Sequence, residues 1–249
     1  MVPDIVHFIW LRGGLSRPFS FINYLSIRSV ADIQKPAKIY LHTDHDEPDN
    51  PHWKAVLPYV ELHHVMPPER IAGRPLNYAQ YKSDVIRLEI LLKHGGTYLD
   101  CDFILLKPFR DLMTSPLTMV HDSPMRHSVS NGVIICAPQQ QFLADWLVAI
   151  PADMDSGIWA NHAVNTPKKL LNTGRYDVRL LPSESFIPFD FLKMYLFETP
   201  PPPIDLSGCY AVHIWETYWR DYVGHVSKEW AATNDTLFSQ IVKPYLTSS

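Results

Sequence analysis

Residues 81–103 read YKSDVIRLEILLKHGGTYLDCDF, a pattern that predicts a helix, a glycine turn and a strand that ends in two carboxylates. The apolar residues of the first half recur at spacings of four, three and four, which is the period of an amphipathic helix. They are Tyr81, Val85, Leu88 and Leu92. Gly95-Gly96 ends the helix because glycine adopts the left-handed cap conformation without steric cost. Residues 97–99 then have strand character, so this segment predicts one α/β unit.

Two charged residues lie beside the apolar stripe of this helix. Asp84 and Arg87 are three residues apart, so both side chains leave the same edge and can reach one ligand or each other. The alternative is a surface ion pair, which contributes less than about 1 kcal/mol to stability. Their position one helix before the carboxylates favours a binding role.

The two carboxylates follow the strand directly. With a two-residue period, Tyr98, Asp100 and Asp102 share one face of the strand. Two carboxylates on one face of an apolar strand repel each other and lose hydration, and a divalent cation relieves both effects. An aspartyl-phosphate phosphatase is an alternative, but Phe103 stands where that chemistry prefers Thr or Val.

Composition limits the class of protein. At 249 residues and 46% hydrophobic, the chain is long enough for one domain with a substantial core, which we expect to span 1–249. The net charge of -4, without a long basic run, gives no indication of nucleic-acid binding. No apolar run has the length of a membrane span, and no signal peptide is evident, so we expect a cytoplasmic protein. The three cysteines, in apolar runs without metal spacing, are expected to be buried thiols.

The start of the chain predicts a βαβ unit of a parallel sheet. A strand at Ile5–Trp10 precedes a helix at Pro18–Ile33 and a second strand at Lys38–Thr43. Ligands of open α/β sheets bind beyond the carboxyl ends of the strands, which is where Trp10 would lie. Trp10 therefore either packs in the core or stacks on a base. No GxGxxG sequence is present to support a dinucleotide site.

Further strands and helices follow the carboxylates. We expect strands at 60–65, 117–121, 132–137, 178–181 and 209–215, and helices at 139–150, 158–171 and 228–246. If the strands at 117–121 and 132–137 form a hairpin, the loop from Asp122 to Asn131 lies on the same side of the sheet as Asp102. This loop makes Asp122 a candidate nucleophile.

These residues resemble a known family, the DXD-containing glycosyltransferases of family 32 and their relatives. The resemblance rests on HFIW at residues 7–10 followed by glycines, Ser-Asp-x-x-Arg at residues 83–87, Gly-Gly-x-Tyr-Leu-Asp-x-Asp at residues 95–102 and His213-Ile214-Trp215. It implies a GT-A fold, with a Rossmann-like mixed central sheet flanked by helices. It also implies a nucleotide-sugar donor, a divalent cation that is usually manganese, and transfer with retention. The family's Thr-Gly-Pro is represented here only by Asn165-Thr166-Pro167, and no membrane anchor is present in the sequence.

The resemblance also implies roles for single residues. Trp10 is similar to the aromatic that packs on the base, and Asp84 and Arg87 to the pair that holds the donor sugar and the diphosphate side. Tyr98 resembles the aromatic that lines the uridine pocket. Asp100 resembles the carboxylate that contacts the ribose and the metal shell, and Asp102 resembles the direct metal ligand. Asn131 resembles a polar residue beside the donor sugar. His213 and Trp215 resemble the segment that completes the metal shell and covers the diphosphate.

His213 is also a candidate ligand on physical grounds. Val212 and Ile214 share the core face of the expected strand, so His213 and Trp215 share the other face, which the GT-A resemblance brings over the carboxylates. An imidazole nitrogen suits manganese better than magnesium. A structural histidine at the end of a strand remains the alternative.

We therefore expect a metal-dependent retaining hexosyltransferase that uses Mn²⁺, or else Mg²⁺. The donor is expected to be a UDP-sugar first and a GDP-sugar second, and the acceptor a saccharide or other hydroxyl of a glycoconjugate. The cation stabilises the departing diphosphate, and Asp100 and Asp102 supply the oxygen ligands that a hard cation prefers. We favour front-face attack over a covalent intermediate on Asp122. The alternatives are an aspartate-based phosphatase and a nucleotide-sugar-binding module without turnover.

Overall fold

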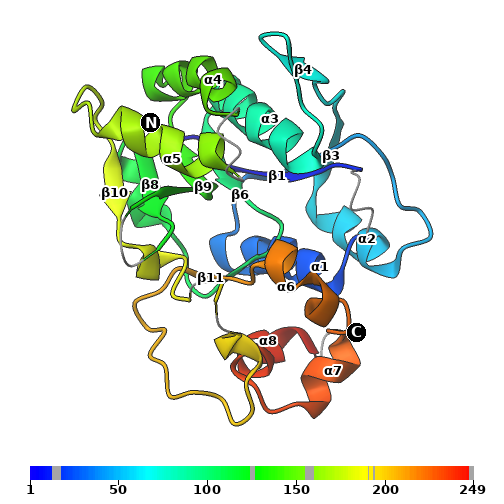
Figure 1. Cartoon of the computed structure of the whole chain (residues 1–249). Helices are drawn as coiled ribbons and strands as arrows, with labels where there is room; N and C mark the ends of the chain where they lie inside the picture. Colours follow the sequence, from blue (N-terminus) through cyan, green and yellow to red (C-terminus); the bar gives the residue numbers. More distant parts are fainter. Residues whose placement is uncertain (13–17, 124–126, 155–159, 190, 193, 247–249) are drawn as a thin grey trace.

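The computed structural model describes residues 1–249 except 13–17, 124–126, 155–159, 190, 193 and 247–249. A seven-stranded sheet in the order β10-β8-β9-β6-β1-β2-β3 crosses the upper half of Figure 1. Its strands are β1 (Ile5–Trp10), β2 (Lys38–Thr43), β3 (Glu61–His64), β6 (Gly96–Leu99), β8 (Leu117–His121), β9 (Val129–Cys136) and β10 (Arg179–Leu181). Among these described strands only β9 runs against the others, since it pairs antiparallel with both neighbours. The mixed α/β sheet confirms the predicted fold class.

Helices lie on both faces of this sheet and in the part of the chain that follows it. They are α1 (Phe21–Ser29), which continues as the π-helix η1 (Val30–Gln34), α2 (Pro51–Val56), α3 (Ala79–His94), α4 (Gln141–Asp153), α5 (Asn161–Leu171), α6 (Glu216–Val223), α7 (Lys228–Thr233) and α8 (Leu237–Leu246). Short 3₁₀ turns lie at η2 (Leu57–Tyr59), η3 (Arg110–Thr114), η5 (Ser183–Ser185) and η6 (Tyr195–Phe197). In Figure 1, α3, α4 and α5 lie above the sheet and α1 and α2 below it.

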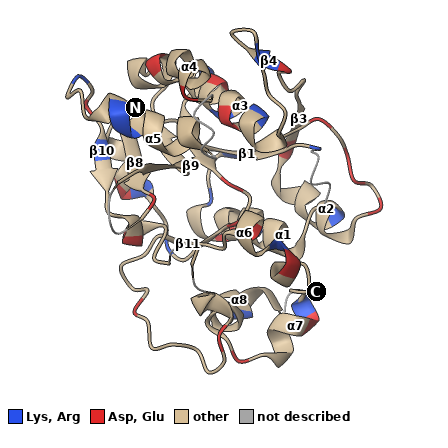
Figure 2. Cartoon of the chain, viewed as in Figure 1, with Lys and Arg blue, Asp and Glu red and all other residues tan. Residues whose placement is uncertain are grey.

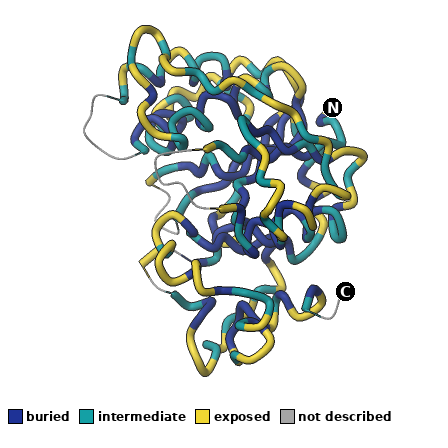
Figure 3. Tube along the Cα trace, turned by 90° about the vertical axis from the view of Figure 1, so that its right-hand side faces the viewer, coloured by how far each residue is buried: buried dark blue, intermediate teal, exposed yellow. Residues whose placement is uncertain are grey.

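The alternation of β1 explains these two layers. Val6 and Phe8 point into a core shared with α1 and α2, whereas Ile9 packs with α3 and α4. Figure 3 shows the buried residues gathered through the middle of the molecule. The carboxyl ends of β1 and β6 therefore lie beside each other, between helices of both layers.

A two-stranded sheet joins the C-terminal part of the chain to the segment after β6. Strand β7 (Phe103–Leu105) pairs antiparallel with β11 (Ala211–His213), and His213 lies opposite Phe103. Helices α7 and α8 pack with α1 in a third apolar cluster below this pair. A hairpin of β4 (Arg70–Ile71) and β5 (Arg74–Pro75) extends from the other end of the molecule.

A buried histidine pair lies under the C-terminal end of α3. His7 Nε2 is 3.0 Å from the Gly95 carbonyl, and His7 Nδ1 is 3.1 Å from His42 Nε2. A carbonyl only accepts, so His7 carries its proton on Nε2 and His42 Nε2 donates to the free Nδ1. Burial lowers the pKa of His7 to about 4 and that of His42 to about 3. Both rings are therefore neutral at pH 7.

Several element bounds differ from those expected. Helix α1 begins at Phe21, where Ser20 and Asn23 form a capping box. The expected terminal helix at 228–246 is two helices, because Asn234 takes an extended conformation and the Thr236 hydroxyl accepts from the Ser239 amide. Strand β9 begins three residues early, at Val129, so Asn131 lies in a strand and not in a loop. The glycines that follow HFIW, Gly13 and Gly14, and the expected helix start at Ile158 lie outside the described residues.

The surface agrees with the composition. Figure 2 shows Lys and Arg and also Asp and Glu scattered over many elements of the fold. None of the described helices is long and apolar enough to cross a membrane, and the cytoplasmic location stays a prediction. Cys101, Cys136 and Cys209 are buried free thiols, which confirms the prediction for them.

Candidate active site

A cavity of about 610 Å³ opens at the carboxyl ends of β1 and β6. It is lined by all ten residues that the sequence singled out as site residues. These are Trp10, Asp84, Arg87, Tyr98, Asp100, Asp102, Asp122, Asn131, His213 and Trp215. They come from elements spread over most of the chain, so the cavity depends on the whole fold.

The two carboxylates and one imidazole meet at this cavity. Ligand atoms of Asp100, Asp102 and His213 lie within 4.8 Å of one another. His213 Nε2 is 3.1 Å from Asp102 Oδ1, and the Glu216 amide donates to Asp102 Oδ2 at 2.9 Å. The His213 ring stacks on Phe103 at 4.3 Å, which fixes its plane. Two carboxylates and an imidazole form a donor set that suits a divalent transition-metal ion.

Asp100 and Asp102 come together by a turn and not by the pleat of a strand. Strand β6 ends at Leu99, and the Phe103 amide donates to the Asp100 carbonyl across the turn. The Tyr98 hydroxyl donates to Asp100 Oδ1 at 2.6 Å. A Cβ on Gly132 would lie 2.6 Å from Asp100 Oδ2, so the Asp100 side chain uses space that only glycine leaves. Asp100 and Asp102 are close together, as predicted, but the prediction that they share one face of a strand is wrong.

Asp84 and Arg87 form a buried ion pair, which excludes the alternative of a surface pair. Their charged atoms are 3.1 Å apart, and both residues are at most 6% exposed. Arg87 Nη1 also contacts Asp100 Oδ1 at 3.1 Å and the Asn131 carbonyl at 2.8 Å, and its remaining N–H groups reach Ser83. Burial alone would lower the pKa of Arg87, but Tyr98, Asp100 and Asp84 raise it.

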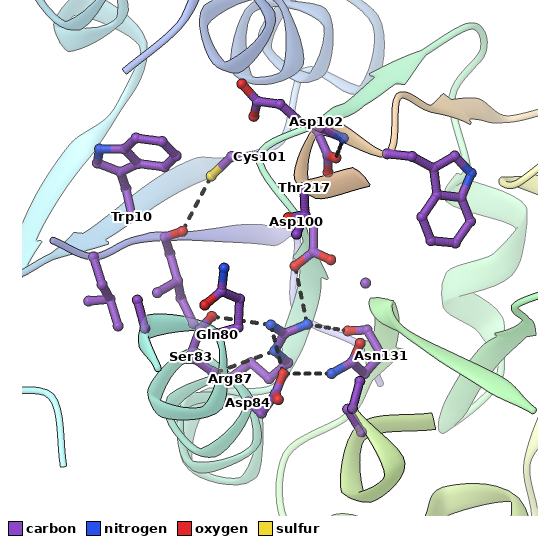
Figure 4. A pocket seen from close by; sticks show the side chains of 18 of the residues that line it. Trp10, Gln80, Ser83, Asp84, Arg87, Asp100, Cys101, Asp102, Asn131 and Thr217 are labelled. Carbon is purple, nitrogen blue, oxygen red and sulfur yellow. Dashed lines mark hydrogen bonds and ion pairs between the residues drawn. The ribbon is translucent and has the colours of Figure 1, made fainter. Parts of the chain in front are cut away.

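Asp84 connects three elements. Its carboxylate accepts from Asn131 Nδ2 on β9 at 2.7 Å and contacts His162 Nε2 on α5 at 2.9 Å. His162 is itself buried. Figure 4 shows Asp84, Arg87 and Asn131 joined below Asp100, with Trp10 to one side. This network holds α3, β9 and α5 together at the cavity wall.

Tyr98 is fully buried between these groups. The Arg87 guanidinium lies over its ring at 4.4 Å from the centroid. Burial raises the pKa of Tyr98 well above its ordinary value, and the Asp100 carboxylate adds to this effect while Arg87 opposes it. The hydroxyl therefore stays protonated and donates to Asp100.

Trp10 is held at the opposite wall. Its Nε1 donates to Glu47 Oε1 at 2.9 Å, and its ring packs edge-on against Phe19. Burial would raise the pKa of Glu47, but hydrogen bonds from Trp10, the Phe19 amide and Asn50 lower it. Trp10 therefore packs against Phe19 and also lines the cavity. Packing in the core does not exclude the predicted stacking on a base.

Comparison with known proteins assigns the chain to a family. The family described as the glycosyltransferase sugar-binding region containing the DXD motif matches residues 27–119. The chain is 33% identical over 263 residues to glucan organizing enzyme 1 of Cryptococcus neoformans, and the match covers 99% of the chain and 71% of that protein. The chain belongs to the DXD-containing glycosyltransferases.

This glycosyltransferase is also similar to a mammalian enzyme in sequence and to a bacterial enzyme in fold. It is 29% identical over 148 residues to the lactosylceramide 4-alpha-galactosyltransferase of Rattus norvegicus, which covers 53% of the chain and 40% of that protein. Its fold is similar to that of the apo form of the glycosyltransferase GlyE of Streptococcus pneumoniae. The TM-score is 0.56 at 12% identity, over 100% of the chain and 61% of GlyE. The fold is thus of the GT-A type, and the chain is a transferase, as predicted.

The sequence did not single out two residues at this site. His162 had no recognisable signal, because a lone histidine in an expected helix is usually structural. Glu216 has a signal, since it is an acidic residue in the first turn of a helix directly after His213-Ile214-Trp215. Its carboxylate accepts from Ser20 Oγ at 3.0 Å and Asn23 Nδ2 at 2.9 Å, while its amide holds Asp102.

One expectation at the C-terminal side needs correction. Strand β11 ends at His213, so Trp215 is not on the strand; it has φ of 60° and caps α6. The Trp215 and His213 rings nevertheless contact each other at 4.1 Å. Asn165 and Thr166 bond to Asn161 and Asp153 within the α4–α5 pair and do not line the cavity.

Proposed function

We propose that the chain transfers a hexose, with retention, from a UDP-linked donor to a hydroxyl of a saccharide or glycoconjugate, in a reaction that requires a divalent cation. A GDP-linked donor is the second candidate. The observation that carries the proposal is the meeting of Asp100, Asp102 and His213 at the cavity, beside the buried Arg87. The galactosyltransferase relative from Rattus norvegicus is named for a glycolipid, lactosylceramide, which supports a glycoconjugate acceptor.

The three side chains fit manganese better than magnesium, because one ligand atom is an imidazole nitrogen. The Glu216 amide donates to Asp102 Oδ2, while Asp102 Oδ1 lies 3.1 Å from His213 Nε2, so these two atoms are placed to share a cation. An outer contact such as that of the Glu216 amide orients a carboxylate ligand. When bound, the cation would neutralise the charge that develops on the departing diphosphate.

The other residues have roles that follow from their positions. Arg87 keeps Asp100 in place and adds positive charge on the diphosphate side. Asp84 and Asn131 are proposed to face the donor sugar, and Tyr98 to line the nucleoside pocket. Trp10, held by Glu47, offers a fixed ring to the base. Trp215 closes the cavity beside His213. Because these residues span the chain, we propose that residues 1–249 act as one catalytic domain.

Retention is compatible with two routes. We favour front-face attack, in which the leaving phosphate takes the acceptor proton and positioned polar groups stabilise the oxocarbenium-like sugar. The alternative is a covalent intermediate on Asp122. Asp122 lines the cavity, and its Oδ1 is buried with no hydrogen-bond partner, so this oxygen is available to react. An Asp122→Asn variant that keeps transfer would exclude the covalent route.

The decisive test is Asp102→Asn. We expect a loss of at least about a hundredfold in manganese-dependent hydrolysis of UDP-galactose and UDP-glucose, because a charged ligand is removed. The matched control is Asp205→Asn, an exposed aspartate outside the cavity. Unchanged manganese half-saturation in Asp102→Asn would show that no cation binds there. The anomeric configuration of the transfer product, read by NMR, tests retention.

A thermal-shift screen identifies the donor. UDP and GDP, each with and without manganese, are compared first, and then the corresponding nucleotide sugars. A ligand at one hundred times its dissociation constant stabilises the folded state by about 2.7 kcal/mol. Stabilisation by GDP and not by UDP would reverse the order of the two donors.

A further inference from the structure

An exposed pair of stacked aromatic rings lies at the rim of the cavity. Phe191 and Tyr218 have ring centroids 4.4 Å apart with planes at 16°. They remain 39% and 50% exposed, and both line the cavity. Stacked rings usually serve to fill a core, but this pair leaves a large apolar area in water. The pair therefore offers exposed aromatic surface at the cavity.

Trp215 holds this pair from behind. Its ring meets Phe191 edge-on at 5.6 Å and Tyr218 edge-on at 5.9 Å. Trp215 Nε1 donates to the Phe189 carbonyl at 2.9 Å, which fixes the indole, and the same indole contacts His213. A continuous aromatic row thus runs from the candidate cation ligand His213 to the surface. Rings held in this way bind a ligand with little loss of side-chain entropy.

The other exposed aromatic rings of the described residues differ from this pair. Tyr78 packs on Tyr81, and Tyr222 packs on Phe197 and Trp230, and neither Tyr78 nor Tyr222 lines the cavity. Among the described residues, Phe191 and Tyr218 are the exposed aromatics that also face the reaction site. Burial raises the pKa of Tyr218, and the nearby Asp122 carboxylate adds to the rise. The Tyr218 hydroxyl therefore lies within electrostatic reach of Asp122.

The residues proposed to bind the donor lie on other elements than the stacked pair. Trp10, Arg87 and Tyr98 lie on β1, α3 and β6, whereas the stacked pair is on α6 and the segment before η6. A hexose ring has one face of C–H groups, which is apolar, and a rim of hydroxyls, which needs polar partners. An exposed aromatic face beside polar cavity residues matches both parts of such a ring.

We propose that Phe191 and Tyr218 form the subsite that binds the acceptor sugar by stacking on the apolar face of its ring. This inference rests on the proposed function, because it presupposes a sugar acceptor. It assigns the acceptor to the α6 side of the cavity and limits it to a saccharide whose terminal ring has an accessible C–H face.

Kinetics of transfer and hydrolysis test the subsite. Donor hydrolysis in water and transfer to methyl β-lactoside, methyl β-cellobioside or methyl α-mannopyranoside are measured with manganese. For Tyr218→Ala and Phe191→Ala we expect the acceptor KM to rise, and the ratio of transfer to hydrolysis to fall, by about tenfold. Tyr218→Phe keeps the ring and is expected to stay within about threefold of the wild type. Tyr222→Ala, on the same helix but outside the cavity, is the control.

Four results would overturn the proposed acceptor subsite or the proposed function. An unchanged acceptor KM in both alanine variants overturns the subsite, as does an equal fall of hydrolysis and transfer, which would place the rings on the donor side. Saturation-transfer NMR with the three glycosides, in the presence of UDP and manganese, measures binding without turnover. Binding of none of them to the wild type also overturns it. If the wild type fails to hydrolyse any nucleotide sugar, the proposed function fails, and not this subsite alone.

Discussion

Helix α3 is anchored by two polar networks of opposite kinds. In its N-terminal half, Asp84 and Arg87 belong to a charged network that reaches Asp100, Asn131 and His162. At its C-terminal end, the Gly95 carbonyl accepts a hydrogen bond from His7, which is in turn bonded to His42, and both rings are neutral. Asp84, Arg87 and His162 are buried, as are His7 and His42, whereas Asp100 and Asn131 are partly exposed. Only the charged network borders the cavity.

The difference shows where the fold tolerates buried charge. Removing two charges from water costs several kcal/mol per ion, and close pairing only partly offsets this cost. The neutral histidine pair satisfies its polar atoms without that cost, as expected of a structural contact. Charge is therefore concentrated where the donor and a cation are proposed to bind, which is the usual arrangement of a functional site.

Arg87→Ala is the strongest way to break the charged network. It leaves Asp84 and Asp100 without their common cation, so we expect a loss of about 3 to 5 kcal/mol in the free energy of unfolding. Urea denaturation measures it. Arg28→Ala, which removes a more exposed i,i+4 pair with Asp32, should cost less than about 1 kcal/mol. Equal losses in the two variants would mean that the Arg87 network is no more than a surface pair.

Acid should break the neutral network. The folded-state pKa values of His7 and His42, about 4 and about 3, lie below the ordinary 6.5, so the unfolded chain takes up protons first. This stability is fully present above pH 6.5 and is lost as the pH falls toward 4, by up to about 3 kcal/mol for each histidine. His42→Asn should flatten the dependence of unfolding free energy on pH. The exposed His225→Asn is the control, and an equally steep profile in His42→Asn would contradict the assignment.

A smaller change would sharpen the comparison at the cavity. Gly132→Ala places a methyl group 2.6 Å from Asp100 Oδ2 and 3.0 Å from Phe103, so the carboxylate must move. We expect about a tenfold rise in manganese half-saturation, with a loss of stability below that of Arg87→Ala. Gly208→Ala, where a Cβ meets nothing within 4 Å, should leave manganese half-saturation unchanged. If Gly132→Ala also leaves manganese half-saturation unchanged, close packing of Asp100 against Gly132 of β9 does not position the carboxylate for the cation.

Local patterns in the sequence predicted most of the sheet, and the members of the site followed from these patterns together with the resemblance to the DXD-containing glycosyltransferases. The strands at Ile5–Trp10 and Lys38–Thr43 were placed to the residue, because apolar runs bounded by turns define them. The pairing of Asp84 with Arg87 followed from helix geometry alone. All ten predicted site residues line one cavity, although their roles remain proposals.

The sequence could not predict contacts that depend on distant segments. Glu216 and Ser20 are far apart in the chain, and nothing local in either indicates that they meet. His162 reaches Asp84 only because α5 packs beside β9. Trp215 was placed on a strand because its alternation with His213 looks regular, yet the chain turns into α6 at that residue. Tertiary packing overrides local period at such junctions.

The pairing of β7 with β11 sets the order in which activity can arise during synthesis. Leu105 lies opposite Ala211, so about one hundred residues must be made between the two halves of this small sheet. The strands of the large sheet end at Leu181, before β11 has left the ribosome. A nascent chain can therefore assemble its main sheet while His213 is still absent. Because the proposed cation site includes His213, that site can be complete only after β11 has been synthesised.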